Sequence, residues 1–180
     1  MAEISEKSLL LHALKKWMPR LTTEEKWSIR EYTGIQKYTL INTILREDRY
    51  EEATTDIQKP IDNIDKALRK FKYEKSFTVY RTVSEQEYDF ILSHNEIEAF
   101  ADFKSTSIAQ EVTEKLTQSP MKHIVVAKLP AMVNGAYIAP LSVFAGEKEF
   151  LLNRGCKYQV ISNFHDIEKD IKYILLEVVI

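Results

Sequence analysis

The chain has 180 residues, and its 27 acidic and 25 basic side chains give a formal net charge of −2. That length fits one domain able to bury roughly 70% of the surface of the unfolded chain, so no stapling metal or disulfide is required. The charge balance argues against a broad basic nucleic-acid surface, the single cysteine excludes an internal disulfide, and neither a membrane-spanning apolar run nor a signal-peptide pattern is present.

The first part of the chain, residues 1–72, shows helical spacing of its apolar side chains. A capping box formed by Thr22 and Glu25 predicts one helix start, and Pro60 predicts another. Residues 48–59 are expected to form a connecting loop. The expected helices cover residues 5–18, 22–32, 35–48 and 60–71.

Tyr38, Asn42 and Arg46 follow one another at four-residue steps along the third expected helix. They therefore share one polar stripe. The stripe is either a solvated face, which the spacing alone favours, or the wall of a cleft that offers a ring, an amide and a guanidinium to one polar ligand.

From Ser76 onward the apolar residues alternate, which is typical of strands. Helices are expected to interrupt the strands at a second capping box, formed by Ser84 and Glu87, and near Ile108. The sequence therefore predicts an α+β fold, helical over 1–72 and rich in strands over 73–180. The expected strands cover residues 77–83, 100–108, 121–129, 136–139, 147–152, 157–161 and 171–179.

Arg81 lies on the same face of the first expected strand as Phe77 and Val79, because side chains two residues apart point the same way. Arginine is rarely buried without a partner. Its side chain therefore either snorkels from an edge strand or is held inside a cleft, where the planar guanidinium would grip a phosphate or carboxylate.

The second expected strand ends in the hydroxyls of Ser105, Thr106 and Ser107. A serine here can orient a nearby carboxylate or cap the following helix, and we assign orientation to Ser105 and capping to Ser107. A serine nucleophile is disfavoured because the chain has no Gly-x-Ser-x-Gly elbow. The four histidines show no metal-binding spacing.

Glu147 and Glu149 are expected on one face of a strand, about 7 Å apart. Two close carboxylates push their pKa values apart, which suits one for stabilising a cation and the other for proton transfer. For an isolated Glu-x-Glu, the favoured interpretation is a solvated edge strand with two exposed acids, because the pattern is common. A glycosidase pair would also fit this separation, but it leaves Arg81 and the Ser-Thr-Ser segment without a role.

In this order, Arg81, Ser105-Thr-Ser107 and Glu147-Lys-Glu149 resemble the signature of the mono-ADP-ribosyltransferase toxins. They are similar above all to binary-toxin enzymatic components, insecticidal vegetative proteins and Rho-modifying exoenzymes. The resemblance extends to Tyr32-Thr-Gly, Ile41-Asn42, Leu45-Arg46, Gly135-Ala-Tyr137 and residues 144–155. It implies one ADP-ribosyltransferase domain over residues 1–180, with the helical lobe packed on a mixed, mainly antiparallel two-sheet β core that carries an NAD cleft.

The same resemblance implies a role for each site residue. Glu149 would stabilise the cation formed as nicotinamide leaves NAD, Ser105 would orient Glu149, and Glu147 would take a proton from the incoming side chain. A glutamate at position 147 goes with arginine acceptors in this family, and Phe144 would contact the target protein. The implied NAD contacts are Arg46, Tyr38, Asn42, Tyr32, Arg81, Thr106 and Ser107.

The implied function is NAD-dependent transfer of ADP-ribose to a protein, with NAD glycohydrolase side activity, NAD as substrate and no metal. The implied setting is a secreted or injected toxin or effector that modifies a host or competitor protein in the target-cell cytosol. Entry into the target cell would depend on a translocation partner, a secretion apparatus or flanking sequence, and an immunity partner is a further candidate partner. Neither nucleic acid nor a membrane span is expected. The alternative is a catalytically silent protein- or nucleotide-binding module on the same fold.

Overall fold

The computed structural model describes residues 4–94, 96–116 and 122–180. Four helices come first, joined by short turns: α1 (Glu6–His12), a π-helical turn (Ala13–Trp17), a 3₁₀ turn (Met18–Arg20), α2 (Thr23–Tyr32), α3 (Ile35–Arg46), a 3₁₀ turn (Tyr50–Glu52) and α4 (Thr55–Arg69). The strands and two further helices follow: β1 (Phe77–Thr82), α5 (Glu85–Ser93), β2 (Glu98–Ala99), β3 (Lys104–Ser107), α6 (Gln110–Leu116), β4 (Lys122–Leu129), β5 (Gly135–Tyr137), a 3₁₀ turn (Ala145–Glu147), β6 (Glu149–Leu152), β7 (Lys157–Asp166) and β8 (Ile171–Val179). Met121, expected to begin a strand, lies outside the described residues. No helix within the described ranges combines the length and apolar character that crossing a membrane would require.

Local sequence signals explain most helix ends. The Thr22 hydroxyl accepts from the Glu25 amide at 3.1 Å and the Glu25 carboxylate accepts from the Thr22 amide at 2.9 Å, so the first capping box is confirmed. The fourth helix begins at Thr55 rather than at Pro60. Amides of residues 57 and 58 donate to the Thr54 carbonyl, so a full turn precedes the proline, which removes only one hydrogen bond near the helix start.

The eight strands of the described residues form one hydrogen-bonded sheet, in the order β2-β7-β8-β4-β1-β3-β6-β5. The two separate sheets that the sequence analysis predicts are therefore not confirmed. The junction between β1 and β3 is narrow, because only Tyr80 and Ser107 pair across it. β4 and β8 are parallel and the other neighbours are antiparallel, which confirms a mixed, mainly antiparallel sheet.

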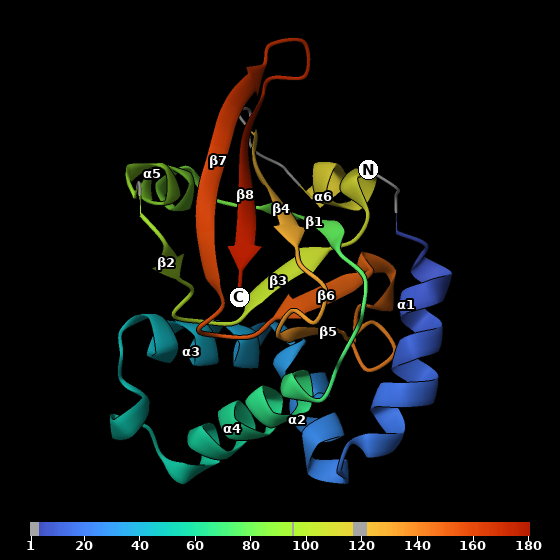
Figure 1. Ribbon diagram of the computed structural model, residues 1–180. Helices are drawn as coiled ribbons and strands as arrows, with labels where there is room; N and C mark the ends of the chain where they lie inside the picture. Colours follow the sequence, from blue (N-terminus) through green and yellow to red (C-terminus); the bar gives the residue numbers. More distant parts are fainter. Residues whose placement is uncertain (1–3, 95, 117–121) are drawn as a thin grey trace.

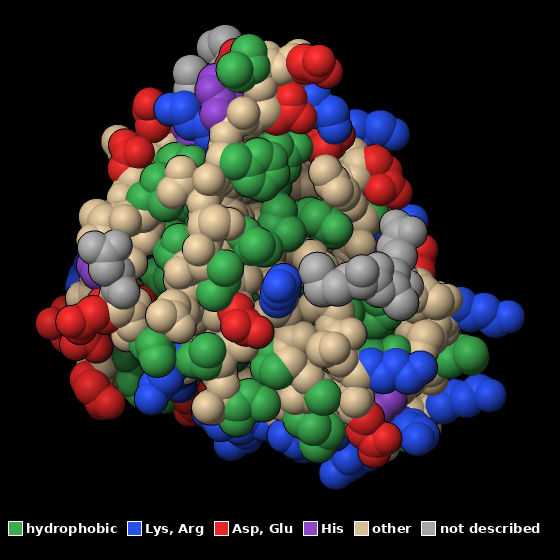
Figure 2. Space-filling model, turned by 45° about the horizontal axis from the view of Figure 1, so that its top comes forward, with side chains coloured by type: hydrophobic (Ala, Val, Ile, Leu, Met, Phe, Trp, Pro, Cys, Tyr) green, Lys and Arg blue, Asp and Glu red, His purple; other side chains and the backbone are tan. Residues whose placement is uncertain are grey.

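β7 and β8 form a long hairpin that projects away from the helices (Figure 1). β7 runs past Ile161, where the sequence predicts its end. A bulge between Val160 and Ser162 adds one unpaired residue, which shifts the in–out alternation of the side chains while the pairing with β8 continues. Phe164 and Ile167 on the hairpin are exposed, and Figure 2 shows apolar side chains gathered on the face below its tip. The two-residue strand β2 pairs with the start of β7 and was too short to predict.

The helices and the sheet share one hydrophobic core. Phe71, which follows α4, packs edge-to-face against Phe150 of β6 with 5.9 Å between the ring centroids. Phe77 of β1 packs in the same way against Phe150, at 5.0 Å between centroids. Such aromatic pairs are stabilising beyond the area that they bury. In Figure 1, α2, α3 and α4 lie together beyond one end of the strands while α1 runs along the side. This packing fixes the start of β6 relative to the helices.

Gly135 marks the closest approach between β5 and β6. A Cβ there would lie 2.7 Å from the Leu151 carbonyl oxygen and 2.8 Å from the Phe150 ring. We expect Gly135→Ala to lower the free energy of unfolding by about 1–3 kcal/mol, because the strands must separate. Gly146→Ala is the control, since its Cβ would meet no atom within 4 Å, and should change stability by less than about 0.5 kcal/mol. Urea unfolding compares them, and equal midpoints would contradict this view of the contact.

Candidate active site

Side chains from four separated segments line one hollow of about 110 Å³, and three of these segments carry the residues selected from the sequence. Arg81 comes from β1, Ser105 from β3, and Glu147 and Glu149 from the turn and strand at the start of β6. The pairing of β3 with β6, which sets Ser107 opposite Glu149 and Ser105 opposite Leu151, brings the last two segments together. The remaining residues around the hollow are Tyr80, Thr82, Thr106, Ser107 and Thr113.

Glu149 is the first residue of β6 and is only 6% exposed. Burial, and after it the charge of Glu147, raise the pKa of its carboxyl from an ordinary value of 4.5, and the net pKa is about 7. A hydrogen bond from Ser105 and the positive charge of Arg81 act in the opposite direction and only partly compensate. Glu149 is therefore a buried acid whose ionised form lacks an adequate counter-charge.

Glu147 does not lie on the strand where the sequence analysis places it. It ends the 3₁₀ turn, and Lys148 has a left-handed backbone with φ 50°, so β6 begins at Glu149. The alternation argument and the 7 Å spacing, which assumed an extended chain, are therefore wrong. Both carboxylates still line the hollow, and burial raises the pKa of Glu147 as well.

Hydrogen bonds and an ion pair hold this turn in place. The Ser107 hydroxyl donates to the Glu147 carbonyl at 2.8 Å and accepts from the Ala109 amide at 3.1 Å, so it both anchors the turn and supports the chain leading into α6. The Lys148 carbonyl accepts from the Ile108 amide at 3.2 Å. The Lys148 ammonium pairs with Glu6 of α1 at 3.1 Å, which ties the turn to the helical part.

Arg81 lies on an interior strand with its side chain 17% exposed, so it is held inside rather than snorkelling from an edge. It donates to the Ser105 carbonyl at 3.0 Å and pairs with Glu87 at 3.3 Å. Burial alone would lower the pKa of this guanidinium, but Glu87 and a hydrogen bond to Tyr38 raise it overall. Its Nε is buried and has no hydrogen-bond partner among the described residues.

Glu87 begins a chain of ion pairs with alternating charge. Its second oxygen accepts from Lys104 at 3.0 Å, Lys104 also pairs with Asp102 at 2.9 Å, and Asp102 pairs with Arg46 of α3 at 3.1 Å. The chain therefore connects the two arginines that sequence analysis selects, and it borders a second hollow of about 640 Å³.

Sequence reasoning missed the three middle members of this chain, Glu87, Lys104 and Asp102. Glu87 was assigned to a capping box, which is only half formed: the Ser84 hydroxyl accepts from its amide, but its carboxylate turns to Arg81 and Lys104. Lys104 lies in register with Thr106 on a buried strand. That placement is the same signal that singled out Arg81.

The polar stripe on α3 separates into three environments. Tyr38 reaches Arg81, and Arg46 is about half exposed beside Asp102. Asn42 is fully buried and exchanges hydrogen bonds with the Tyr32 hydroxyl at 3.0 and 3.3 Å. Tyr32 in turn packs against Tyr38, with ring centroids 5.5 Å apart. Tyr32 and Asn42 thus support the wall of the site from behind rather than facing a ligand.

The last two predicted positions lie at opposite extremes of exposure. The Thr106 hydroxyl is buried and donates to the Phe150 carbonyl at 2.5 Å, which ties β3 to β6. Phe144 is 44% exposed on the loop before the 3₁₀ turn, next to the exposed Val143. Among the described side chains, no group of three or more His, Cys, Asp or Glu residues is arranged to hold a metal ion.

Comparison with known proteins identifies the family. The model of the ADP-ribosyltransferase exoenzyme family matches residues 10–180. The NAD(+)–arginine ADP-ribosyltransferase EFV of Enterococcus faecalis is 36% identical over 154 residues, which is 81% of this chain, and the chain spans about 30% of that relative. The chain therefore belongs to the ADP-ribosyltransferase exoenzyme family, and the resemblance seen in the sequence is confirmed.

Solved structures share the fold. Plx2a, an ADP-ribosyltransferase toxin from Paenibacillus larvae, is 26% identical with a TM-score of 0.78, covering 99% of this chain and 98% of its own. C3stau2 from S. aureus, solved with NAD, is 21% identical with a TM-score of 0.75, covering 97% of this chain and 92% of its own. The predicted α+β toxin fold is confirmed.

The raised pKa of Glu149 predicts a pH-dependent effect on stability. Because the folded pKa lies near 7 and the unfolded value near 4.5, the folded state binds the extra proton between these limits and loses stability as pH rises through them. Glu149→Gln should therefore be more stable than the parent by up to about 3 kcal/mol at pH 8 and by about 1 kcal/mol at pH 5.

Thermal unfolding at both pH values measures this effect. Glu147→Gln is the matched control, because its carboxyl is less buried and should give a smaller pH-dependent gain. A stability difference between Glu149→Gln and the parent that stays the same from pH 5 to pH 8 would contradict the raised pKa.

Proposed function

We propose that this chain is an NAD-dependent mono-ADP-ribosyltransferase that transfers ADP-ribose to an arginine side chain of another protein. One observation carries the proposal: a buried, under-compensated Glu149, oriented by Ser105, shares a hollow with Glu147 and Arg81. A site built in this way is ready for a ligand that brings positive charge to Glu149 and negative charge to Arg81. NAD has both, in its nicotinamide ring and its pyrophosphate.

The polar groups in the site fit NAD. The unpartnered Nε of Arg81 is free to donate to a phosphate oxygen, and Arg46 offers a second, half-exposed guanidinium at the other end of the ion-pair chain. The hollow of about 110 Å³ is smaller than the roughly 300 Å³ of a typical ligand pocket. It would take the nicotinamide riboside end, and the remainder of the dinucleotide would extend past Arg81 toward Arg46.

The reaction breaks the bond between the nicotinamide nitrogen and C1′ of the ribose, and the bonding electron pair leaves with nicotinamide. The ribose becomes oxocarbenium-like, and the fixed negative charge of Glu149 stabilises this cation. A guanidinium nitrogen of the acceptor then bonds to C1′. The acceptor nitrogen loses a proton in that step, and Glu147, whose pKa burial has raised, accepts it. With water as acceptor, the same steps give NAD hydrolysis as a side activity.

The arginine acceptor rests on Glu147 and on the named activity of the Enterococcus relative. A protein acceptor would approach over the loop before β6, where Val143 and Phe144 present exposed apolar side chains. We assign target contact to Phe144, direct NAD contact to Arg46, Tyr38 and Arg81, and support of the NAD site to Tyr32, Asn42, Thr106 and Ser107.

The biological setting that we propose is a toxin or effector, secreted or injected, that modifies a host or competitor protein in the target-cell cytosol. The Paenibacillus protein, which is named a toxin and is 26% identical, supports this setting. A translocation or immunity partner would complete it. We also propose that residues 1–180 act as a single domain, 1–72 as a helical lobe and 73–180 as the catalytic core, which the shared hydrophobic core supports.

Variants of the two carboxylates test the proposed reaction. The parent should release nicotinamide from NAD without an acceptor and should label agmatine, a small arginine analogue. Glu149→Gln should lower both activities about 10²- to 10³-fold, because both pass through the same cation. Glu147→Gln should keep most of the hydrolysis and lose transfer to agmatine. Measurement of both products from one reaction gives the ratio directly.

Two results would change this assignment. Equal loss of both activities in Glu147→Gln would refute the division of labour between the carboxylates. Saturable NAD binding by the parent without nicotinamide release would favour the catalytically silent binding module.

A further inference from the structure

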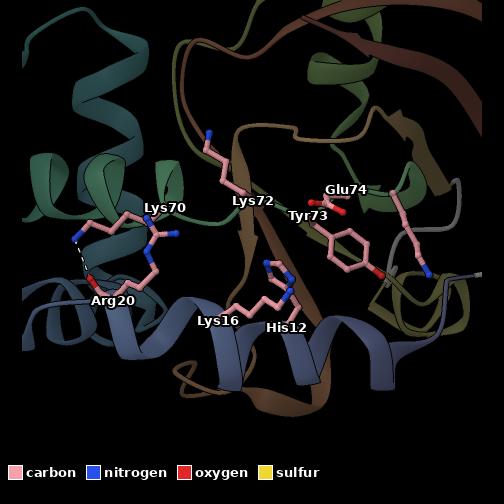
Figure 3. A pocket seen from close by; sticks show the side chains of 8 residues that line it. His12, Lys16, Arg20, Lys70, Lys72, Tyr73 and Glu74 are labelled. Carbon is pink, nitrogen blue, oxygen red and sulfur yellow. Dashed lines mark hydrogen bonds between the residues drawn. The ribbon is translucent and has the colours of Figure 1, made fainter.

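A third hollow, of about 290 Å³, lies between α1 with the two turns that follow it and the segment that joins α4 to β1. It shares no lining residue with the hollows around Arg81 and Arg46. Figure 3 shows His12 and Lys16 on the helix below and Lys72, Tyr73 and Glu74 on the facing segment. The other lining residues are Arg20, Lys70 and Lys75.

The hollow carries an uncompensated positive charge. Lys70 contacts both oxygens of Glu25 at 2.7 Å and the Arg20 carbonyl at 3.2 Å, so its charge is matched. The other four cations, Lys16, Arg20, Lys72 and Lys75, make no ion pair with any carboxylate in the described part of the chain. Glu74 is the one acid in the lining. The four unpaired cations and Glu74 together carry a formal charge of +3, on a protein whose net charge is −2.

Packing contacts hold the backbone around the hollow. Lys16 lies on the π-helical turn, a rare conformation often found at functional sites, and the Trp17 indole anchors that turn by donating to the Ala67 carbonyl at 2.8 Å. The His12 ring packs edge-on against Phe71 and Tyr73, at 4.7 and 5.3 Å between centroids. Four exposed cations thus surround a packed floor.

We propose that this hollow binds a compact oligophosphate group, meaning two or three linked or neighbouring phosphates. Ammonium and guanidinium donors suit phosphate oxygens, and several phosphate charges are needed to match four cations. The hollow lies near the lower end of the volumes of small-molecule sites, which favours a headgroup over a folded partner. The phosphates could belong to a soluble oligophosphate or to a phosphorylated lipid headgroup, which share this chemistry.

His12 provides a local reporter of the bound anion. Its pKa is lowered by burial first and then by the charge of Lys16, while Glu74 raises it. An oligophosphate in the hollow would offset the charge of Lys16 and therefore raise the pKa of His12. The His12 ring proton signals in an NMR titration show this change at the site itself.

Isothermal titration calorimetry with sodium tripolyphosphate at low ionic strength measures the affinity of the hollow for an oligophosphate and tests the proposal. We expect saturable binding to the parent and a loss of affinity of about tenfold or more in the double variant Lys72→Gln, Lys75→Gln, whose side chains are exposed. The matched control is Lys59→Gln, Lys157→Gln, which removes the same charge from exposed positions on α4 and β7. NAD hydrolysis should be unchanged in both double variants, so failure of this proposal is separable from failure of the enzymatic one.

Neutral vesicles with and without a phosphorylated inositol lipid distinguish a lipid headgroup from a soluble oligophosphate as the natural ligand. Vesicle binding that tripolyphosphate displaces, and that the Lys72/Lys75 variant loses, supports the headgroup. Binding of tripolyphosphate alone supports the soluble ligand. The proposal is overturned by equal affinities in the two double variants, or by an unchanged pKa of His12 at saturation, since either result places the anion elsewhere.

Discussion

An ionised carboxylate that is removed from water is destabilised unless positive charge or hydrogen bonds compensate it. For the buried Glu149, Ser105 and Arg81 supply only part of this compensation. The β3–β6 pairing sets Glu149 opposite Ser107, a hydrogen bond from Ser105 orients its carboxyl, and the left-handed Lys148 immediately precedes it. The ionised Glu149 carboxylate therefore lowers the stability of the folded protein. The same carboxylate supplies a fixed negative charge where the proposed reaction develops a positive one.

The arrangement of the cations follows a different principle. Arg81 and Arg46 belong to the sheet and to a helix, yet alternating charges on Glu87, Lys104 and Asp102 connect them. Each acid in this chain contacts two cations, so the two guanidinium groups are positioned without being fully neutralised. Flexible arginines would need ordering when a ligand binds, and this network reduces that entropic penalty.

The features that sequence predicted are those that depend on near neighbours or on alternation. The Thr22–Glu25 capping box involves residues three apart. The register of Arg81 with Phe77 and Val79 singles out this arginine but leaves an edge and a cleft placement open, and the structure shows the cleft placement. Glu87, Lys104 and Asp102 could not be ranked, because each is a common surface residue whose partner lies on another element. Gly146 indicates a turn at this point of the sequence, but the residue with positive φ is Lys148, which is not a glycine. The Lys148 ammonium pairs with Glu6 on the distant α1, and such a contact cannot be read from local sequence.

The central claim is that Glu149 lacks a counter-charge which the substrate brings. A carboxyl ¹³C NMR titration of Glu149, with and without a non-hydrolysable NAD analogue that keeps the nicotinamide cation, measures this most directly. The account predicts a pKa of about 7 in the free protein and a fall of about one unit or more on saturation. A value near 4.5 in the free protein, or a pKa that the analogue leaves unchanged, would contradict it.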